Sequence, residues 1–268
     1  MRSVNVHQDS SLYREYPPPP LLHGRIECFW ERDVHALSGH VHRVLPDGCI
    51  DVLFECEGVS AATSYVVGAM TRPLLVARSD AMHVFAVRFK PGAAAEFFRP
   101  PLFHLTDARI DLGDLWSHPL GLVEQVCAAT TSQERINLVA QELMCRLSDK
   151  RPIQRKVTLA LQTLARRPDR SIEQLCRELG ITRQGLAKGF RNSVGLSPKM
   201  LARILRMRIV LKHIHRSQRR PVLWRDVAQC AGYYDQAHMI NEFQALNGLT
   251  PQQVIDEDAN PVSISPIL

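Results

Sequence analysis

The order of apolar and polar positions divides the chain into a strand-rich part and a helix-rich part. Between Arg25 and Lys90, short apolar runs alternate with Gly, Pro, Asp and Ser, which is the pattern of successive β-strands. From Pro91 onward, apolar residues recur every three to four positions, which is typical of amphipathic helices. The pattern predicts an α+β chain of two domains, in which a β-rich domain with flanking helices precedes an all-α domain.

The strand-rich part predicts a barrel or a sandwich. Its runs are RIECFWE, HVHRVL, CIDVLFE, SYVVGAM and MHVFAVRFK. In the third run, Ile50, Val52 and Phe54 share one face, while Asp51 and Glu55 lie on the other. One face is therefore core, and the other is solvent or the lining of a polar pocket.

Breaks in the pattern give the expected boundaries. The run of four prolines before residue 21 cannot continue a helix or a central strand, and SDKRP at 148–152 is polar and ends on proline. We expect an N-terminal arm at 1–20, a β-rich domain at 21–150, a helical domain at 153–256 and a flexible tail at 257–268.

The helical part contains a duplicated unit. GITRQGLAKGFRNSVGLSP, starting at Gly180, and GYYDQAHMINEFQALNGLTP, starting at Gly232, align with an offset of 53 positions over most of their length. In each copy a helix stops at the glycine, and a second helix starts at an N-cap residue, Thr182 or Asp235. This is a helix-turn-helix arrangement, and a helix of roughly 25 Å, MLARILRMRIVLKHIHR, joins the two copies.

The second helix of each copy has one apolar and one polar face. Leu186 with Phe190, and Met239 with Phe243, are four positions apart and must face the core. The opposite faces carry the side chains that can read DNA bases: Arg183, Gln184, Ala187 and Lys188, and then Gln236, Ala237, Ile240 and Asn241. Gln and Asn can pair with adenine, Arg and Lys with guanine, and Ala or Ile can touch the thymine methyl group.

Phosphate contacts are expected from side chains around these faces and along the joining helix. They are Arg191, Lys199, Arg203, Arg206, Lys212, Arg216, Arg219, Arg220 and Gln244. Amphipathic helices with charged outer faces can also be plain solvated surface. The distribution of charge favours DNA: residues 1–150 hold 14 Lys and Arg against 18 Asp and Glu, whereas residues 151–268 hold 19 against 9.

Residues 153–256 resemble the tandem helix-turn-helix domain of the AraC/XylS family of bacterial transcription regulators. The resemblance rests on GYYDQAHMINEFQALNGLTP, in which Gly232, His238, Phe243, Gly248 and Pro251 stand where the family pattern has them. It implies two recognition helices in successive major grooves, and activation through contact with RNA polymerase. The chain departs from the family pattern at Gly185 and Gly189, inside the first recognition helix. Each glycine lowers the helix propensity by ~1 kcal/mol relative to Ala.

The N-terminal part is similar to the β-rich sensor domains of such regulators in the runs VLPDGCIDVLF at 44–54, VVGAMTRP at 66–73 and VRFKPGAAAEFF at 87–98, and we expect a cupin-like barrel. A concave site lined by Asp47, Asp51 and Arg88 is the candidate pocket for a small-molecule effector. The alternative is that Asp47-Gly48 forms a turn and Asp51 bonds to backbone. A homodimer formed through this domain is a further possibility that the sequence does not decide.

The rival hypothesis is a cupin-type metalloenzyme or metal sensor with a DNA-binding tail. His40 and His42 are two positions apart on one face of a strand and could bind one metal ion, with Asp47 or His83 as substitutes for the missing ligands. The set is incomplete, and the chain shows no nucleophile–base set, P-loop or dinucleotide fingerprint. We therefore expect no enzyme activity and no cofactor.

The cysteines and the termini bear on the compartment. The seven cysteines are scattered without a CxxC pair, which predicts reduced thiols rather than a disulfide framework or a zinc site, and leaves a cysteine redox sensor as a minor option. No apolar run suits a signal peptide or a membrane span. We expect a cytoplasmic protein without a membrane partner, associated with the nucleoid when it is bound to double-stranded DNA.

Overall fold

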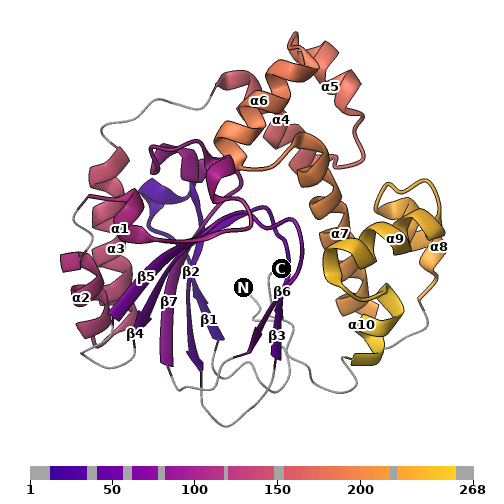
Figure 1. Ribbon diagram of the computed structural model, residues 1–268. Helices are drawn as coiled ribbons and strands as arrows, with labels where there is room; N and C mark the ends of the chain where they lie inside the picture. Colours follow the sequence, from indigo (N-terminus) through magenta and orange to yellow (C-terminus); the bar gives the residue numbers. More distant parts are fainter. Residues whose placement is uncertain are drawn as a thin grey trace.

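The structure, a computed structural model, describes residues 13–34, 41–56, 62–77, 82–117, 120–147, 154–217 and 222–257. Figure 1 shows a β-rich N-terminal part with helices beside it, followed by a C-terminal part made of helices. This confirms the α+β organisation. The expected linker at 148–152 and most of the tail lie outside the described residues.

The N-terminal part contains two antiparallel sheets. The larger sheet has six strands in the order β1-β2-β7-β4-β5-β8, and the smaller sheet pairs β3 with β6. In Figure 1 the smaller sheet stands apart from the larger one. The strands are β1 (Tyr13–Tyr16), β2 (Ile26–Val34), β3 (Val41–Val44), β4 (Ile50–Cys56), β5 (Ala62–Val67), β6 (Leu74–Ala77), β7 (Met82–Phe89) and β8 (Arg109–Asp111).

Five of these strands coincide with the predicted runs, and three were missed. β6 is apolar throughout, and β8 has only three residues, which is too short for its alternation to be recognised. β1 lies in the segment expected to be an extended arm, where Tyr13–Tyr16 pairs in register with β2 as the edge of the larger sheet. The four prolines come directly after β1, so they end a strand rather than exclude one.

The core of the N-terminal part lies on the predicted face of the large sheet. Val52 and Phe54 of β4 and Phe85 of β7 are fully buried, and Phe29 of β2 stacks on Phe85. Helix α2 packs against β4 and β5. The helical elements of this part are η2 (Pro20–Leu22), η3 (Ala93–Glu96), η4 (Leu102–Leu105), α1 (Leu112–Leu115), α2 (Leu120–Ala128) and α3 (Ser132–Leu147).

The expectation that every cysteine is a reduced thiol is wrong for one pair. Cys56, at the end of β4, and Cys127, in α2, form a disulfide across 71 positions of sequence. The scattered spacing gave no hint of the bond, because the sheet and a helix from elsewhere in the chain bring the two residues together.

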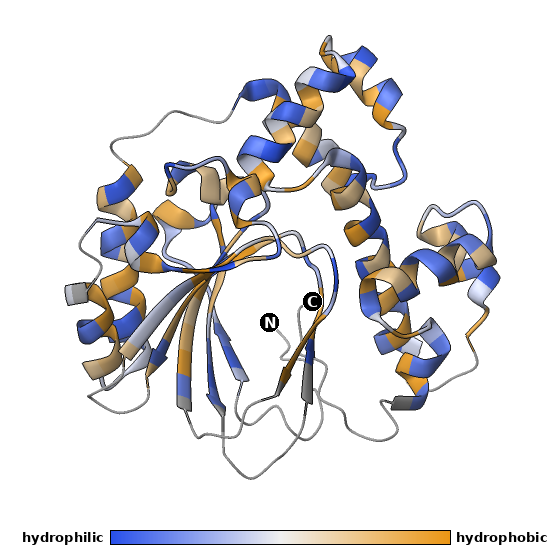
Figure 2. Ribbon diagram, in the orientation of Figure 1, coloured by the Kyte–Doolittle hydropathy of each residue, from blue (hydrophilic) through white to orange (hydrophobic). Residues whose placement is uncertain are grey.

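The C-terminal part consists of seven helices within the ranges that the structure describes. They are α4 (Arg155–Arg166), α5 (Ile172–Leu179), α6 (Arg183–Val194), α7 (Pro198–Ser217), α8 (Trp224–Cys230), α9 (Gln236–Asn247) and α10 (Pro251–Glu257). Figure 2 shows hydrophobic and hydrophilic segments alternating along them, as expected for helices with one buried face. None of the described helices is both long and apolar enough to cross a membrane.

Close packing explains one of the glycines inside α6. A Cβ at Gly189 would lie 2.5 Å from Cγ2 of Val157 in α4, which is closer than real atoms approach. The glycine therefore lets α4 and α6 come together, and this contact offsets its weak helix propensity. Gly185 lies in the first turn of α6, where its N–H donates to the Thr182 hydroxyl.

Replacing Gly189 with alanine is therefore expected to destabilise the protein by about 1–3 kcal/mol, the usual cost of overpacking a core. Helix propensity alone predicts the opposite sign, a gain of about 1 kcal/mol. Urea unfolding measures the difference. Gly121, where an added Cβ meets nothing within 4 Å, is the matched control in α2, and its alanine variant should be neutral or more stable.

Candidate nucleic-acid interface

The first helix-turn-helix unit is formed by α5 and α6. Ser171 caps α5 by accepting a hydrogen bond from the N–H of Gln174, and Gly180 ends the helix in the left-handed conformation at φ 56°. Thr182 then caps α6 through the N–H of Gly185. A non-glycine residue at position 180 would be strained, so the tight turn depends on this glycine.

The second unit repeats this construction with α8 and α9. Gly232 takes φ 76°, and Asp235 caps α9 by accepting from the N–H of His238 at 2.7 Å. A Cβ at Gly232 would lie 2.4 Å from Cβ of Asp169 in the α4–α5 loop. The turn of the second unit therefore packs directly on the loop that leads into the first unit.

The predicted base-reading residues lie on accessible faces in both units. Leu186 and Phe190 of α6, and Met239 and Phe243 of α9, are fully buried as the periodicity required. On the opposite faces all eight residues are exposed or half-buried: Arg183, Gln184, Ala187, Lys188, Gln236, Ala237, Ile240 and Asn241. Ala187 and Ile240 are the two half-buried members.

The two accessible faces differ in charge. The face of α6 includes Arg183 and Lys188, both exposed, whereas the corresponding face of α9 holds only amides and apolar side chains. A cationic face adds attraction to any phosphate backbone, while an amide face contributes through hydrogen bonds to base edges. The two units can therefore contribute differently to affinity and to selectivity.

The expected phosphate-binding residues lie in different environments. Four of them are exposed and can reach the phosphate backbone of DNA: Lys199, Lys212, Arg216 and Gln244. Arg219 and Arg220 lie outside the described residues. Arg203 and Arg206 of α7 are instead turned to Glu242 of α9, with N–O distances of 3.1 and 2.6 Å.

Glu242 is the centre of an ion-pair network between the long helix and the second recognition helix. Its side chain is 14% exposed, and besides the two arginines it approaches Nε2 of His238 at 3.5 Å. The Arg206 guanidinium also lies over the ring of Tyr233, 4.9 Å from its centroid. Burial favours a higher pKa for Glu242, but the hydrogen bond and charge of Arg206, with Arg203 and His238, outweigh it and lower the pKa.

The end of the first recognition helix is held by the N-terminal part. Arg191, expected to contact phosphate, places its guanidinium over the ring of Phe103 in η4, 4.7 Å from the centroid. The Thr106 hydroxyl donates to the carbonyl of Gly195 at 2.6 Å. α6 packs on η3 and η4, so the N-terminal domain and the first unit share a surface.

One exposed residue beside the second recognition helix is absent from the predicted DNA contacts. Tyr234 is 94% exposed, whereas its neighbour Tyr233 is 6% exposed. It precedes the N-cap Asp235 and therefore lies at the end of α9 that carries unpaired backbone N–H groups. The signal was in the sequence: a turn that buries one of two successive tyrosines exposes the other.

The three residues expected to line an effector pocket do come together, but they bind one another. Arg88 donates to both carboxylate oxygens of Asp51, at 3.1 and 2.9 Å, and lies 3.5 Å from Asp47. Asp47 also accepts from the N–H of Cys49, which agrees with the predicted turn at Asp47-Gly48, whereas Asp51 accepts, among the described residues, from the side chains of Arg88 and Trp30 and not from backbone as that alternative had it. The Asp47 carbonyl accepts from Arg208 of α7 at 3.5 Å. This network joins the sheet to the long helix.

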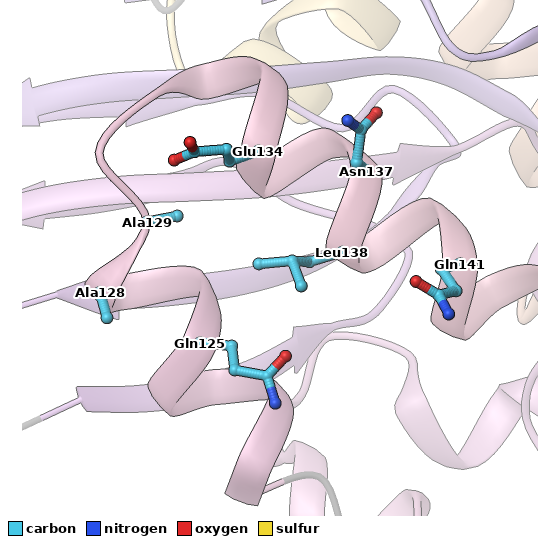
Figure 3. A pocket seen from close by; sticks show the side chains of 7 residues that line it. All are labelled: Gln125, Ala128, Ala129, Glu134, Asn137, Leu138 and Gln141. Atoms are coloured by element: carbon cyan, nitrogen blue, oxygen red, sulfur yellow. The ribbon is translucent and has the colours of Figure 1, made fainter.

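A shallow pocket, open to solvent, lies elsewhere, between α2 and α3 (Figure 3). Its lining is mostly amide and apolar: Gln125, Ala128, Ala129, Glu134, Asn137, Leu138 and Gln141. Glu134, the one carboxylate in this lining, already accepts from the backbone N–H groups of Thr130 and Thr131. These hydrogen bonds lower its pKa.

The proposed metal ligands are not assembled in the described part of the chain. No group of three or more His, Cys, Asp or Glu side chains within the described ranges could hold a metal ion. His40 lies outside those ranges, and only the backbone of His42 is described, in β3. His83 binds Asp33 through Nδ1 at 2.7 Å.

Two family models match separate parts of the chain. Residues 14–111 match a family described as a domain of unknown function (DUF6597), and residues 175–257 match a family described as a helix-turn-helix domain. The second match spans α6 to α10 and most of α5. A search of curated proteins gives no match.

Several solved structures show a distant overall similarity. ToxT from Vibrio cholerae is 8% identical with a TM-score of 0.43, over 92% of this chain and 98% of that chain. ToxT from strain SCE256 with a bound unsaturated fatty acid is 10% identical with a TM-score of 0.41, over 93% and 97%. The xylose-binding transcription activator XylR is 16% identical with a TM-score of 0.32, over 47% and 39%. Values this low do not establish a common fold.

Proposed function

We infer that this chain is a DNA-binding transcription regulator whose C-terminal part is a tandem helix-turn-helix domain of the AraC/XylS type. The observation that supports this most directly is the repeated construction of α5–α6 and α8–α9. In each unit a left-handed glycine turn and a capped helix leave a polar face open, and the helix-turn-helix match covers both. Such helices read bases from the major groove.

The long helix supports the proposal that one chain reads two successive grooves. α7 has 20 residues, which corresponds to about 30 Å at the usual rise of an α-helix. Successive major grooves on one face of DNA are about 34 Å apart. A rigid spacer of this length suits two half-sites about one helical turn apart.

We propose a division of labour between the units. Arg183 and Lys188 make the first unit the source of charge, while Gln236 and Asn241 suit adenines in an A·T-leaning half-site. Tyr234 supports the second unit from outside the groove: its hydroxyl can donate to a phosphate beside the start of α9. It thereby adds affinity where the recognition face has no cation.

The contacts between the two parts support a sensor role for the N-terminal domain. Arg191 on Phe103 and Arg208 on the Asp47 carbonyl tie that domain to α6 and α7. A small-molecule effector or a second copy of the chain that binds the N-terminal domain could therefore alter the DNA-binding helices. Because Asp47, Asp51 and Arg88 already bind one another, an effector would bind elsewhere on the N-terminal domain, and the shallow pocket between α2 and α3 is one place for it.

The proposed location in the cell follows from DNA as the proposed ligand. A regulator that reads chromosomal DNA works in the cytoplasm, at the nucleoid. The resemblance to AraC/XylS regulators supports activation through RNA polymerase as the output.

Selection of bound sequences from a random pool of DNA duplexes tests the function, with the full chain as bait. We expect enrichment of two conserved boxes about 10 base pairs apart, the spacing of successive major grooves on one face. Enrichment of a single box would contradict the two-groove geometry. Binding without enrichment of any sequence would contradict the regulator itself.

A further inference from the structure

The structure assigns a reversible thiol–disulfide site to Cys56 and Cys127, through which α2 is tied to the large sheet or released from it. The pair joins residues 71 positions apart, with the two Cα atoms 5.3 Å apart. That separation is within the usual range for disulfides, so the backbone needs no rearrangement to form the bond.

These two sulfurs are placed for exchange, whereas the other cysteines are not. Cys56 and Cys127 are half-buried, so a small thiol can approach them. Cys28, Cys49 and Cys176 are buried, and burial raises the pKa of Cys28 to about 12 and that of Cys49 well above its ordinary value. A thiol that stays protonated is a poor nucleophile. Cys145 and Cys230 are exposed but are not bonded to another cysteine.

The helix that carries Cys127 depends on tertiary contacts. α2 has nine residues, and a helix this short is marginal by itself. Val123 and Val126 bury its inner face, and the disulfide fixes its C-terminal end to the last residue of β4. The bond therefore sets how firmly α2 is held.

The same helix forms one wall of the pocket in Figure 3. Ala128 and Ala129, directly after Cys127, line it, and α3 provides the opposite wall. A movement of Cys127 therefore also moves Ala128, the next residue, which lines the pocket. Oxidation holds this wall in place, and reduction leaves it held by apolar packing and by Arg135 of α3, which donates to the carbonyls of Val126 and Ala129.

Glutathione disulfide can oxidise the two thiols in two successive exchanges. One protein thiolate attacks the glutathione disulfide, forms a mixed disulfide and releases one glutathione thiolate. The second protein thiolate then attacks the protein sulfur of the mixed disulfide, forms the Cys56–Cys127 bond and releases the second glutathione. One disulfide is lost and one is formed, and the two protein protons pass to the glutathione thiolates.

The test is a redox titration of the full-length protein in buffers of reduced and oxidised glutathione. After alkylation of free thiols, peptide mass spectrometry measures the bonded fraction at each ratio. We expect this fraction to rise from almost none to almost all across the series. The oxidised form should unfold about 10 °C above the reduced form, because the bond closes a long loop in the unfolded chain.

Serine variants separate this bond from general thiol oxidation. Cys56→Ser and Cys127→Ser should each abolish the bonded peptide and the difference in unfolding temperature, while Cys145→Ser and Cys230→Ser should change neither. Three results on the wild-type protein would overturn the proposal: both cysteines alkylated at every ratio, a bond that persists at the most reducing ratio, or equal unfolding temperatures for the two forms.

Discussion

Replacing Glu242 with glutamine is expected to lower the free energy of unfolding by about 3 kcal/mol. The change leaves Arg203 and Arg206 close together without their shared carboxylate, and breaking a buried ion pair from one side costs about 3–5 kcal/mol. The lower end applies because these side chains keep 14–24% of their exposure. Urea unfolding monitored by circular dichroism measures the loss.

The matched control is Glu178→Gln in α5. Glu178 pairs with Arg170, but it is about half exposed, and such surface pairs contribute about 0–1 kcal/mol. Equal losses in the free energy of unfolding for the two variants would contradict a stabilising ion-pair network between α7 and α9. The Glu242 variant should also lose affinity for a two-box operator, because α9 is no longer held at a fixed distance from α6.

The contribution of Glu242 should depend on pH with a defined sign. Its pKa is lowered in the folded protein, so the unfolded chain binds the proton more readily. The stability difference between wild type and Glu242→Gln is therefore present in full above about pH 5, and is lost as the pH falls through the folded pKa, below an unfolded value of about 4.3. A difference that grew on acidification would contradict the ion-pair assignment.

Replacing Asn241 with alanine is expected to weaken operator binding by about 5- to 150-fold while leaving binding to random DNA almost unchanged. The range corresponds to about 1–3 kcal/mol for one bidentate contact to a base. Asn241 is exposed on the outer face of α9 and has no charge to attract phosphates, so its loss should affect selectivity alone. Competition titrations with both DNAs at one salt concentration measure the ratio.

Two other variants serve as comparisons for Asn241→Ala. Lys188→Ala in the first unit should also reduce operator binding more than random binding, but it should lower the salt dependence as well, because a cation is removed. Tyr234→Ala should weaken binding to both DNAs about equally, since a phosphate contact carries no sequence information. Equal losses on both DNAs for Asn241→Ala would remove it from the base-reading set.

Local rules were sufficient to predict the helix-turn-helix units. Thr182, Asp235, Gly180 and Gly232 act through hydrogen bonds and backbone angles within a few residues, so their roles could be predicted from sequence order alone. The buried faces of α6 and α9 follow from helical periodicity in the same way. β1 was missed because the prolines that follow it argue against a strand, and β6 because its four apolar residues show no alternation; both strands are stabilised by pairing with a partner.

The sequence by itself determined the α+β division, the duplicated unit, the caps and the polar faces offered to DNA, because each depends on neighbours within one or two helical turns. The tertiary structure alone decided what distant residues do. It paired Arg203 and Arg206 with Glu242, placed Arg191 on Phe103 and bonded Cys56 to Cys127. A charged or sulfur-containing side chain has the same chemistry wherever it lies, and its role depends on which partner the fold brings within reach.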